Sequence, residues 1–514
     1  MGYCKICCAD KMIVGRWYKL VTYAVGYGVP YNYTVTYSAA GENVVLLHDT
    51  LYVKSAGAFT VSCMDMYGNT DSKTIQAIGK PTISRTPHSI TPTDWVDFQS
   101  KVTAAGANAL ISVQTGEYVF ALTDAAYTLP AGTVVDFQGS TIQIEPTATT
   151  YTGFQIVNDH CGIKNANFVG NMLNDTSYSD MCKTISVLSG DYAELENITF
   201  DGLPGFNITI GTWPSFWNFL PNSSASRWDE ANNTSGYIGN DGNVIASTGA
   251  WTMSEPVGII TTPDRSYYVG QSNMWIPSAV RLYDIAFYDS EMNLLELRKD
   301  QQYYRKYYYP ESAAYVRYCV WQDAAPENHT GRDDVCVMRM MAGDAEHQQC
   351  LSVREAYIDN IVYANHASGG LSIVGGCEDI HINRMVARGN GWQNGWAFDA
   401  EDGWNSMLGI VVTHSYFDKG AIVLHGCQGA TLMSCISGSV TLNNGIHFPT
   451  IINDLIGALY VRDLRGCATL ANTYCSGVTN DTGYEATYIF GARTADENTS
   501  MRSRINWMLA IAEN

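Results

Sequence analysis

Consecutive segments near the C-terminal end of the chain repeat one pattern at a spacing of 25 residues. The repeat covers residues 371–395, 396–420 and 421–440. This period is expected when each segment forms one coil that returns the chain by one strand spacing along an axis. A single coil buries its inward face only against its neighbours. The repeat therefore predicts a stack of parallel coils in which Cys377, Asp402 and Cys427 lie in line.

Composition favours a large β-rich protein that does not bind polyanions. The chain has 514 residues, is 46% apolar and 16% charged, and contains 46 Gly and 33 Tyr. This combination is typical of β structure with many turns and more than one domain. The net charge of −20 repels nucleic acid and anionic membranes. No apolar run reaches the ~20 residues of a membrane span, so neither nucleic-acid binding nor membrane insertion is expected.

The cysteines and the first residues bear on the compartment. The 14 cysteines form no paired framework, which predicts assembly in a reducing cytoplasm. Cys4, Cys7 and Cys8 form the densest group, but no second cysteine or histidine pair follows at zinc-site spacing. We expect a buried or interface thiol cluster there and no metal or cofactor. The first 15 residues lack the apolar core of a signal peptide.

Composition and turn residues divide the chain into six parts. They are an N-terminal segment (1–12), a β-sandwich module (13–82), the first coils with a capping helix (83–210), an inserted β module (211–330), the second coils (331–490) and a C-terminal helix (491–514). Pro81, Pro87 and Pro92 mark the linker after the first module. Trp95, Phe98 and Val102 then lie on one face of a short amphipathic helix.

Short motifs in these parts resemble known modules. GAFTVSCMDMYGNTDSKTI, within residues 57–75, predicts a hairpin with its turn at GN and resembles the last hairpin of Ig-like modules. The helix DWVDFQSKVTAAG followed by GEY, LPAGT and FQGST resembles the opening of pectate-lyase-like proteins. FYDSEMNLLE before PESAAYVRYCVW resembles a jelly-roll module of phage tail fibres. These resemblances imply an all-β chain: a right-handed parallel β-helix with an N-terminal Ig-like β-sandwich and an inserted antiparallel jelly-roll-like module.

The stretch DAEDGW places Asp399, Glu401 and Asp402 within four positions. The 25-residue alignment puts them in the rows of Val374, Gly376 and Cys377 of the preceding coil and of Leu424, Gly426 and Cys427 of the next. Acids in otherwise neutral rows add repulsion without a visible structural return. One protonated and one ionised carboxyl are what a glycosidase requires. We therefore expect a catalytic site at these acids, and the segment F-D-x-E-D-G-W resembles one carried by pectate-lyase-like bacterial and phage sequences.

Other side chains are expected within about 5–10 Å of the acids if the coils stack. The expected substrate-binding residues are Trp392, Trp396, Trp404, His425, Glu378, Arg384 and Arg388. The motifs that polygalacturonases carry on successive coils are absent, so pectin hydrolysis is not supported. In the insert, Trp251, Tyr267, Tyr268 and Trp275 offer stacking faces for sugars or fill a sandwich core.

Two alternatives for the acids stay open. In lyases of this fold, carboxylates hold Ca²⁺ against a uronate while Arg384, Arg388 or Lys419 would take the proton. A structural role is the other: the acids accept backbone hydrogen bonds or hold a structural cation. Calcium is the cofactor only in the lyase alternative.

The combined architecture resembles bacteriophage tailspike or tail-fibre proteins. The resemblance implies a virion tail protein, made in the host cytoplasm, that binds and cleaves capsular polysaccharide or O-antigen by acid–base glycosidase chemistry. It also implies a homotrimer that meets other tail proteins through its N-terminal region. The alternatives are a non-enzymatic receptor-binding or structural virion protein, a Ca²⁺-dependent lyase, and an extracellular bacterial enzyme.

Overall fold

The structure is a computed structural model of the chain. It describes residues 3–6, 8–25, 35–172, 175, 177–179, 181–211, 217–218, 233–259, 266–269, 282–302, 305–310, 312–320, 339–340, 353–366, 370–375, 377–388, 396–400, 407–443, 446–447, 449–462, 464–465, 468–480 and 489–490.

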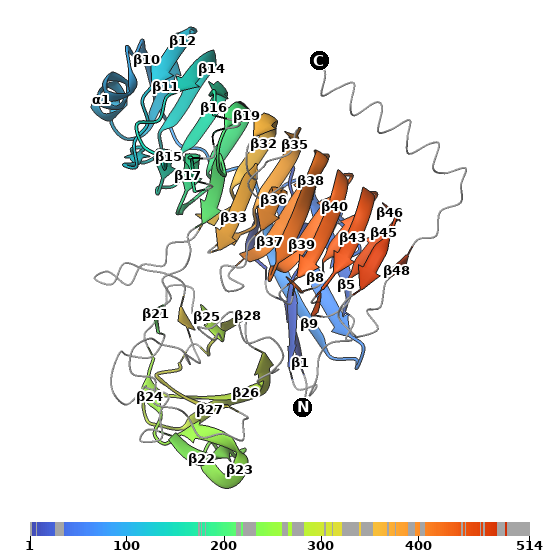
Figure 1. The fold of residues 1–514 in the computed structure, drawn as a ribbon. Helices are drawn as coiled ribbons and strands as arrows, with labels where there is room; N and C mark the ends of the chain where they lie inside the picture. The colour runs from blue at the N-terminus through green and yellow to red at the C-terminus, as the bar shows by residue number, and fades with distance from the viewer. Residues whose placement is uncertain are drawn as a thin grey trace.

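A long stack of parallel strands forms the body of the molecule (Figure 1). Before the interruption its strands are β10 (Thr86–Ile90), β11 (Ala109–Val113), β12 (Glu117–Phe120), β13 (Tyr127–Thr128), β14 (Val134–Ile144), β15 (Thr152–Ile156), β16 (Gly162–Val169), β17 (Lys183–Val187), β18 (Gly190–Asp191), β19 (Glu194–Leu203) and β20 (Ile208–Gly211). Strands far apart in sequence order pair in parallel, as β16 does with β19. This pairing is that of a parallel β-helix.

The stack continues after the interruption. These strands are β31 (Val353–Arg354), β32 (Tyr357–His366), β33 (Leu371–Gly375), β34 (Cys377–Glu378), β35 (His381–Ala387), β36 (Trp396–Ala400), β37 (Met407–Thr413), β38 (Tyr416–His425), β39 (Gln428–Met433), β40 (Ile436–Asn443), β41 (Ile446–His447), β42 (Thr450–Ile452), β43 (Leu455–Val461), β44 (Leu464–Arg465), β45 (Thr469–Ala471), β46 (Tyr474–Cys475), β47 (Val478–Asn480) and β48 (Ile489–Phe490). β32 pairs with β19, so the chain resumes on the next rung. The expected all-β class and parallel β-helix are confirmed.

One helix, α1 (Trp95–Ala105), covers the open end of the first coils (Figure 1). Its N-cap Asp94 accepts a hydrogen bond from the Asp97 backbone N–H at 2.9 Å, which satisfies a free donor of the first turn. Trp95 and Phe98 are buried on one face, as the sequence predicts. The Phe98 ring stacks at 5.7 Å on Phe137 of the first coils. The helix therefore seals a hydrophobic core that would otherwise end in water.

Aromatic rings continue that core along the axis. Phe168 stacks on Phe200 at 5.6 Å, and Phe200 stacks on Tyr363 across the interruption at 5.0 Å. All three side chains are buried. Like residues stack because the register places them on successive rungs. The two parts of the β-helix therefore share one core.

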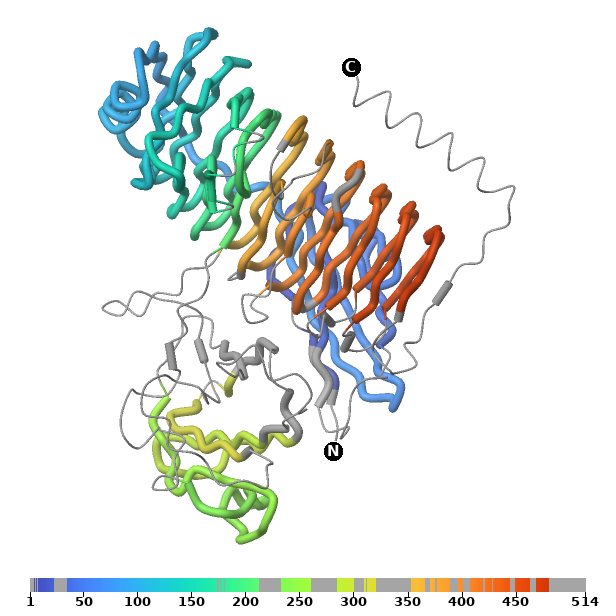
Figure 2. The backbone as a smooth tube through the Cα atoms, viewed as in Figure 1, coloured from blue at the N-terminus to red at the C-terminus, as the bar shows by residue number. Residues whose placement is uncertain are grey.

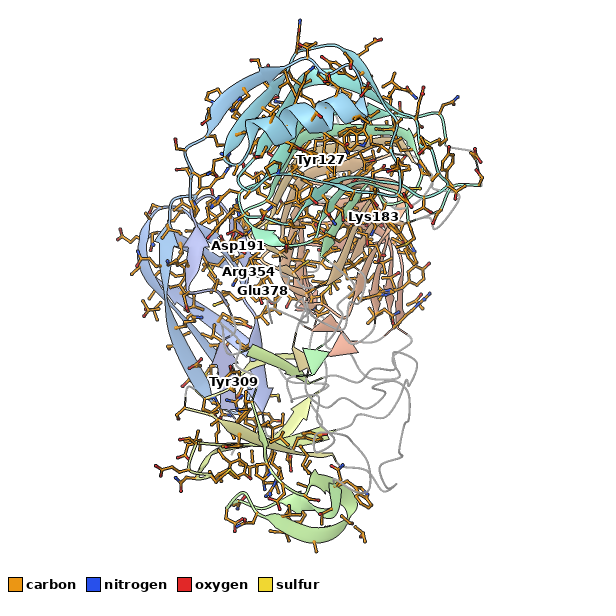
Figure 3. All side chains as sticks on the ribbon, turned by 90° about the vertical axis from the view of Figure 1, so that its left-hand side faces the viewer. Tyr127, Lys183, Asp191, Tyr309, Arg354 and Glu378 are labelled. Atoms are coloured by element: carbon orange, nitrogen blue, oxygen red, sulfur yellow. The ribbon has the colours of Figure 1, made fainter. Side chains whose placement is uncertain are left out.

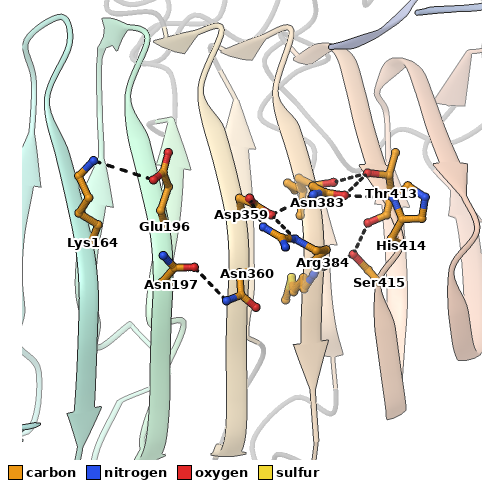
Figure 4. Close-up of polar contacts among 12 residues, drawn as sticks. Lys164, Glu196, Asn197, Asp359, Asn360, Asn383, Arg384, Thr413, His414 and Ser415 are labelled. Carbon is orange, nitrogen blue, oxygen red and sulfur yellow. Dashed lines mark hydrogen bonds and ion pairs between the residues drawn. The ribbon is translucent and has the colours of Figure 1, made fainter. Parts of the chain in front are cut away.

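A row of left-handed residues forms one corner of the coils. Asn165, Asn197 and Asn360 each have φ 55°, a conformation that Asn tolerates better than most residues. The Asn197 amide donates to Asn165 Oδ1 at 2.9 Å, and the Asn360 amide donates to Asn197 Oδ1 at 2.9 Å. Figure 4 shows part of this ladder. It satisfies polar groups at a sharp bend.

The N-terminal module contains one four-stranded sheet, one three-stranded sheet and one two-stranded sheet. Its strands are β1 (Tyr3–Ile6), β2 (Lys11–Ile13), β3 (Trp17–Lys19), β4 (Thr22–Val25), β5 (Val35–Ala40), β6 (Val44–Leu47), β7 (Thr50–Val53), β8 (Gly57–Asp65) and β9 (Thr70–Ile78). β8 and β9 form the expected hairpin. Cys4 and Met12 lie in one core with Phe59, so the strands before residue 13 pack with this module.

This module lies along the later coils, with β3 packed against β37 and β39 (Figure 2). Buried polar groups join the two. Glu355 accepts hydrogen bonds from Arg16 Nη1 at 2.9 Å and from the Tyr18 hydroxyl at 3.0 Å, and His381 Nε2 lies 3.0 Å from it. Arg16 is 6% exposed and Glu355 8%. We call Arg16, Tyr18, Glu355 and His381 the interface cluster.

A second buried group lies farther along the same interface. Lys19 Nζ contacts Asp49 Oδ2 at 2.5 Å and Thr450 Oγ1 at 2.7 Å. The Thr450 hydroxyl also donates to Asp49 at 2.7 Å, and Thr50 and Thr431 share a hydrogen bond of 2.8 Å. Each partner comes from a different part of the chain, so these contacts fix how the module sits on the coils.

The inserted module is antiparallel. Its strands are β21 (Trp217–Asn218), β22 (Asn233–Ile238), β23 (Val244–Met253), β24 (Val257–Gly258), β25 (Ser266–Val269), β26 (Leu282–Tyr288), β27 (Leu294–Gln302), β28 (Arg305–Tyr308), β29 (Tyr315–Val320) and β30 (Arg339–Met340). β30 pairs with β21 and β25, so the insert sheet extends beyond residue 330 and the coils resume at Val353. The Ig-like and jelly-roll-like assignments stay predictions. The expected C-terminal helix lies outside the described residues.

The 25-residue alignment is wrong in register. Cys377 pairs with Met407, not with Asp402. Asp399 pairs with Ser372 on one side and with Val423 on the other, instead of with Val374 and Leu424. Ala400 pairs with Ile373, 27 positions earlier (400 − 373), whereas Met407 pairs with Cys377, 30 positions earlier (407 − 377). The spacing between rungs is therefore neither 25 residues nor constant. Coil length varies because turns absorb insertions without disturbing the stacked strands.

Candidate functional site

Asp399 lies in β36 on the outward side of the coil. Phe398 before it belongs to the internal core, and neighbouring residues of a strand point to opposite faces. The row that contains Asp399 has Ser186, Thr209 and Ser372 on the three preceding rungs. All four side chains are at most 3% exposed. Three buried hydroxyl groups therefore precede the carboxyl group along this row, and Val423 follows it.

The hydroxyl and carboxyl side chains of this row are buried. Thr209 Oγ1 donates to Ser186 Oγ at 3.1 Å, so the hydroxyls are linked along the axis. Asp399 itself is 0% exposed. Burying a carboxyl costs free energy that hydrogen bonding must offset. The partners of Asp399 in register are Ser372 and Val423.

The remaining members of the expected acid site cannot be placed in this row. Glu401, Asp402, Trp404 and Trp392 lie outside the described residues. The side chain of Lys419 is also outside the description. Asp399 is thus the member of the predicted cluster whose position the structure gives.

Two expected binding residues lie on the same strand layer as Asp399. Trp396 begins β36, is half-buried and pairs with Ala421. His425 follows Leu424, which pairs with Ala400 on the preceding rung. Burial lowers the pKa of His425 to about 4, and Arg462 adds to the shift. The imidazole is therefore neutral at physiological pH and able to donate or accept a hydrogen bond.

Three other expected binding residues lie in strand layers other than that of Asp399. Arg384 sits at the asparagine-ladder corner with φ 54° and pairs with Asp359, with 2.8 Å between Nε and Oδ1 (Figure 4). Arg388 ends the same layer, where its N–H donates to the Tyr363 carbonyl at 2.7 Å. Glu378 lies in β34, a separate short strand layer. The reason is that one coil turns twice between Glu378 and Asp399.

Glu378 belongs to a charged row that the sequence did not single out. In register, Asp191, Arg354 and Glu378 occupy successive rungs, and Figure 3 shows them close together. Arg354 Nε contacts Asp191 Oδ1 at 3.1 Å. Burial raises the pKa of Asp191, while Arg354 opposes the shift. Because an arginine lies between the two carboxylates, the row balances its own charge and resembles a structural ladder.

The structure adds two observations about ligands and membranes. Within the described ranges, no group of three or more His, Cys, Asp or Glu side chains is arranged to hold a metal ion. In the same part of the chain, no helix has both the length and the apolar character needed to cross a membrane. Trp251 of the insert is half-buried in β23, whereas the side chains of Tyr267, Tyr268 and Trp275 lie outside the description.

Comparisons with known proteins give two structural likenesses. A tailspike protein gp49 from Acinetobacter baumannii bacteriophage Fri1, a capsular polysaccharide depolymerase, aligns with a TM-score of 0.39 and 8% identity, over 82% of this chain and 64% of that one. ORF18 of Geobacillus virus E2 aligns with a TM-score of 0.23 and 9% identity, over 77% and 58%. The chain therefore spans less than two thirds of either protein. No family model and no curated protein matches the sequence.

Proposed function

We propose that this protein is a tailspike-type protein that binds a bacterial capsular polysaccharide or O-antigen and cleaves it within the chain. The observation that supports the proposal is Asp399, a buried carboxyl preceded by hydroxyl groups in its row on the outward side of a β-helix. A carboxyl held away from water is suited to act on a substrate that excludes solvent.

The proposed chemistry is acid–base hydrolysis of a glycosidic bond. Glu401 and Asp402 follow Asp399 after one alanine in the sequence and are assigned as the groups that contact the sugar. One donates a proton to the leaving oxygen, and the other activates water or stabilises the positive charge of the transition state. Asp399, which is buried in β36, is assigned as a supporting group of this site. Trp396 offers a flat face for a sugar ring, and neutral His425 offers a hydrogen bond.

Assembly and location are part of the same proposal. Cleavage outside the cell requires a carrier, and a phage tail provides one. A homotrimer with coils side by side and contact with other tail proteins through the N-terminal region are consistent with this role. The insert is assigned to carbohydrate binding. A second candidate is binding without cleavage, in which Asp399 is a structural acid of the coil.

The test is to incubate the purified protein with capsule and O-antigen from a panel of bacteria and to size the products. Hydrolysis predicts shorter chains with new reducing ends and no absorbance near ~235 nm. A lyase would produce that absorbance and would stop when calcium is chelated. Binding without any change in chain length, on a polysaccharide that the protein retains, would reject the enzymatic proposal in favour of the second candidate. Asp124→Asn, which changes an exposed aspartate, is the matched control for the variant Asp399→Asn.

A further inference from the structure

Two cysteines face each other in the core of the N-terminal module. Cys4 lies in β1 and Cys63 in β8, and their Sγ atoms are 3.3 Å apart. Their exposed fractions are 1% and 2%. Both are free thiols. The other apolar groups of this core, among them Phe59 and Ile75, hold the two strands in place.

The surrounding contacts fix both strands. β1 pairs with β4, where Cys4 lies opposite Ala24. The Ile6 N–H donates to Asp71 Oδ2 at 3.0 Å, which ties β1 to β9. Cys63 lies in the middle of a three-strand arrangement, opposite Tyr37 on one side and Asp71 on the other. The two sulfurs are therefore aimed at each other by the backbone on both sides.

Closing the remaining gap needs little movement. A disulfide has a sulfur–sulfur distance of about 2.05 Å, so the atoms must approach by roughly 1.2 Å. Rotation about the side-chain bonds covers such a distance when the Cβ atoms already face each other. The hydrogen bond between the thiols raises the pKa of Cys4 and lowers that of Cys63. The thiolate is the form that attacks a disulfide, and the attack takes place while the thiols are accessible, before the module closes over them.

We propose that Cys4 and Cys63 form a redox modification site that closes to a disulfide when the protein meets a small-molecule disulfide as oxidant. The Cys63 thiolate attacks the oxidant and releases one of its thiols. Cys4 then attacks the mixed disulfide and releases the second thiol. One sulfur–sulfur bond is formed and one is broken, the two cysteines lose two electrons and two protons, and the oxidant becomes two thiols.

The consequence is a covalent link between the first strand and the body of the module. The cysteines are 59 positions apart, and closing a long loop restricts the unfolded chain and stabilises the folded one. The linked strands carry the module whose β3 packs on the coils. Oxidation would then strengthen the part of the protein that holds the interface cluster. Nothing in the proposed polysaccharide chemistry requires this link.

The experiment compares the full chain made in two buffers. One sample is synthesised in a cell-free system that contains oxidised glutathione, so that the thiols meet the oxidant before they are buried, and the other in excess reductant. Free thiols are alkylated in denaturant, and peptides are mapped by mass spectrometry. We expect a peptide that links Cys4 to Cys63 in the oxidised sample and a melting temperature several degrees above that of the reduced sample.

Variants distinguish the site from general oxidation. Cys63→Ala should lose both the linked peptide and the difference in melting temperature, whereas Cys435→Ala, which removes a buried thiol of the coils, should keep both. The proposal is overturned if both cysteines are alkylated after oxidation. It is also overturned if the linkage is to Cys8, whose half-buried thiol lies near Cys63, or if the linked protein melts no higher than the reduced one.

Discussion

Charge is buried in two regions of this molecule, and the two differ in what surrounds it. In the interface cluster the Glu355 carboxylate meets an arginine, a tyrosine hydroxyl and a histidine, each about 3 Å away. In the row of Asp399 the register neighbours are Ser372 and Val423. In the interface cluster the charged groups join two modules, which accounts for their burial. Asp399 lies on the outward side of a coil, in a stretch of chain that also contains Glu401 and Asp402, which is why we propose a function for it.

The largest expected effect breaks the interface cluster. Glu355→Ala removes the acceptor and leaves Arg16 buried without its counter-charge. Loss of one partner of a buried pair costs about 3–5 kcal/mol, so urea unfolding should begin at a clearly lower concentration. Glu117→Ala, an exposed acid on β12, is the control and should change stability by less than about 0.5 kcal/mol. Equal stability of both variants would show that the module does not rest on this contact.

Acid should weaken the fold through buried histidines. Burial lowers the pKa of His425 to about 4, and burial also lowers that of His381. A lowered folded-state pKa means that the unfolded chain binds the proton more readily, so stability falls as pH drops from about 6.5 to about 4. For His425 the loss is at most about 3 kcal/mol. The melting temperature of His425→Gln should fall less across this pH range than that of the parent. An equal fall in both proteins would contradict the role given to His425.

Asp454, in the coils, gives folding stability the opposite dependence on pH. Burial raises the pKa of its carboxyl well above the usual range, although Oδ1 accepts the Cys435 N–H at 2.8 Å. Because its pKa is raised in the folded state, Asp454 contributes to folding stability in full below the unfolded-state pKa near 4. This contribution is lost as pH rises. Asp454→Asn should therefore be more stable than the parent at pH 7 by at least about 1 kcal/mol. The difference should vanish at pH 4; a destabilised variant at pH 7 would show that the ionised form is needed.

The smallest expected effect concerns Arg384, whose side chain is 53% exposed beside Asp359. Exposed pairs contribute about 0–1 kcal/mol, so Arg384→Gln should scarcely change the melting temperature. Because this corner lies in a different row from Asp399, polysaccharide affinity should also stay the same. A clear loss of affinity would restore the original expectation that Arg384 binds substrate.

The sequence predicted the regular parts of the fold because their patterns are local. The helix face of Trp95 and Phe98, the hairpin of β8 and β9 and the existence of stacked coils all follow from short-range periodicity. The register of the coils did not follow, because the spacing between paired residues changes from 27 (Ile373 and Ala400) to 30 (Cys377 and Met407) without a local mark in the sequence. A constant period was therefore the wrong model for a stack of unequal coils.

The interface could not be predicted from one sequence. Arg16 and Glu355 are 339 positions apart, and neither stands out by composition or motif. The row of Asp191 and Arg354 was missed for the same reason, because its partners are separated by the insert. The acidic stretch at Asp399 was found because three acids stand together in a sparsely charged chain. Its surroundings, and hence its relation to Arg384 and Glu378, needed the coordinates.

The most direct test of the contrast between the two regions measures turnover and melting temperature in the same two variants, Asp399→Asn and Glu355→Gln, on a polysaccharide that the parent cleaves. We predict that Asp399→Asn lowers turnover by about 10²–10³-fold, as expected for loss of a preorganised polar group, and leaves the melting temperature within a few degrees. Glu355→Gln should lower the melting temperature and keep the activity per folded molecule. Full turnover in Asp399→Asn, together with a lower melting temperature, would contradict the account and make both buried acids structural.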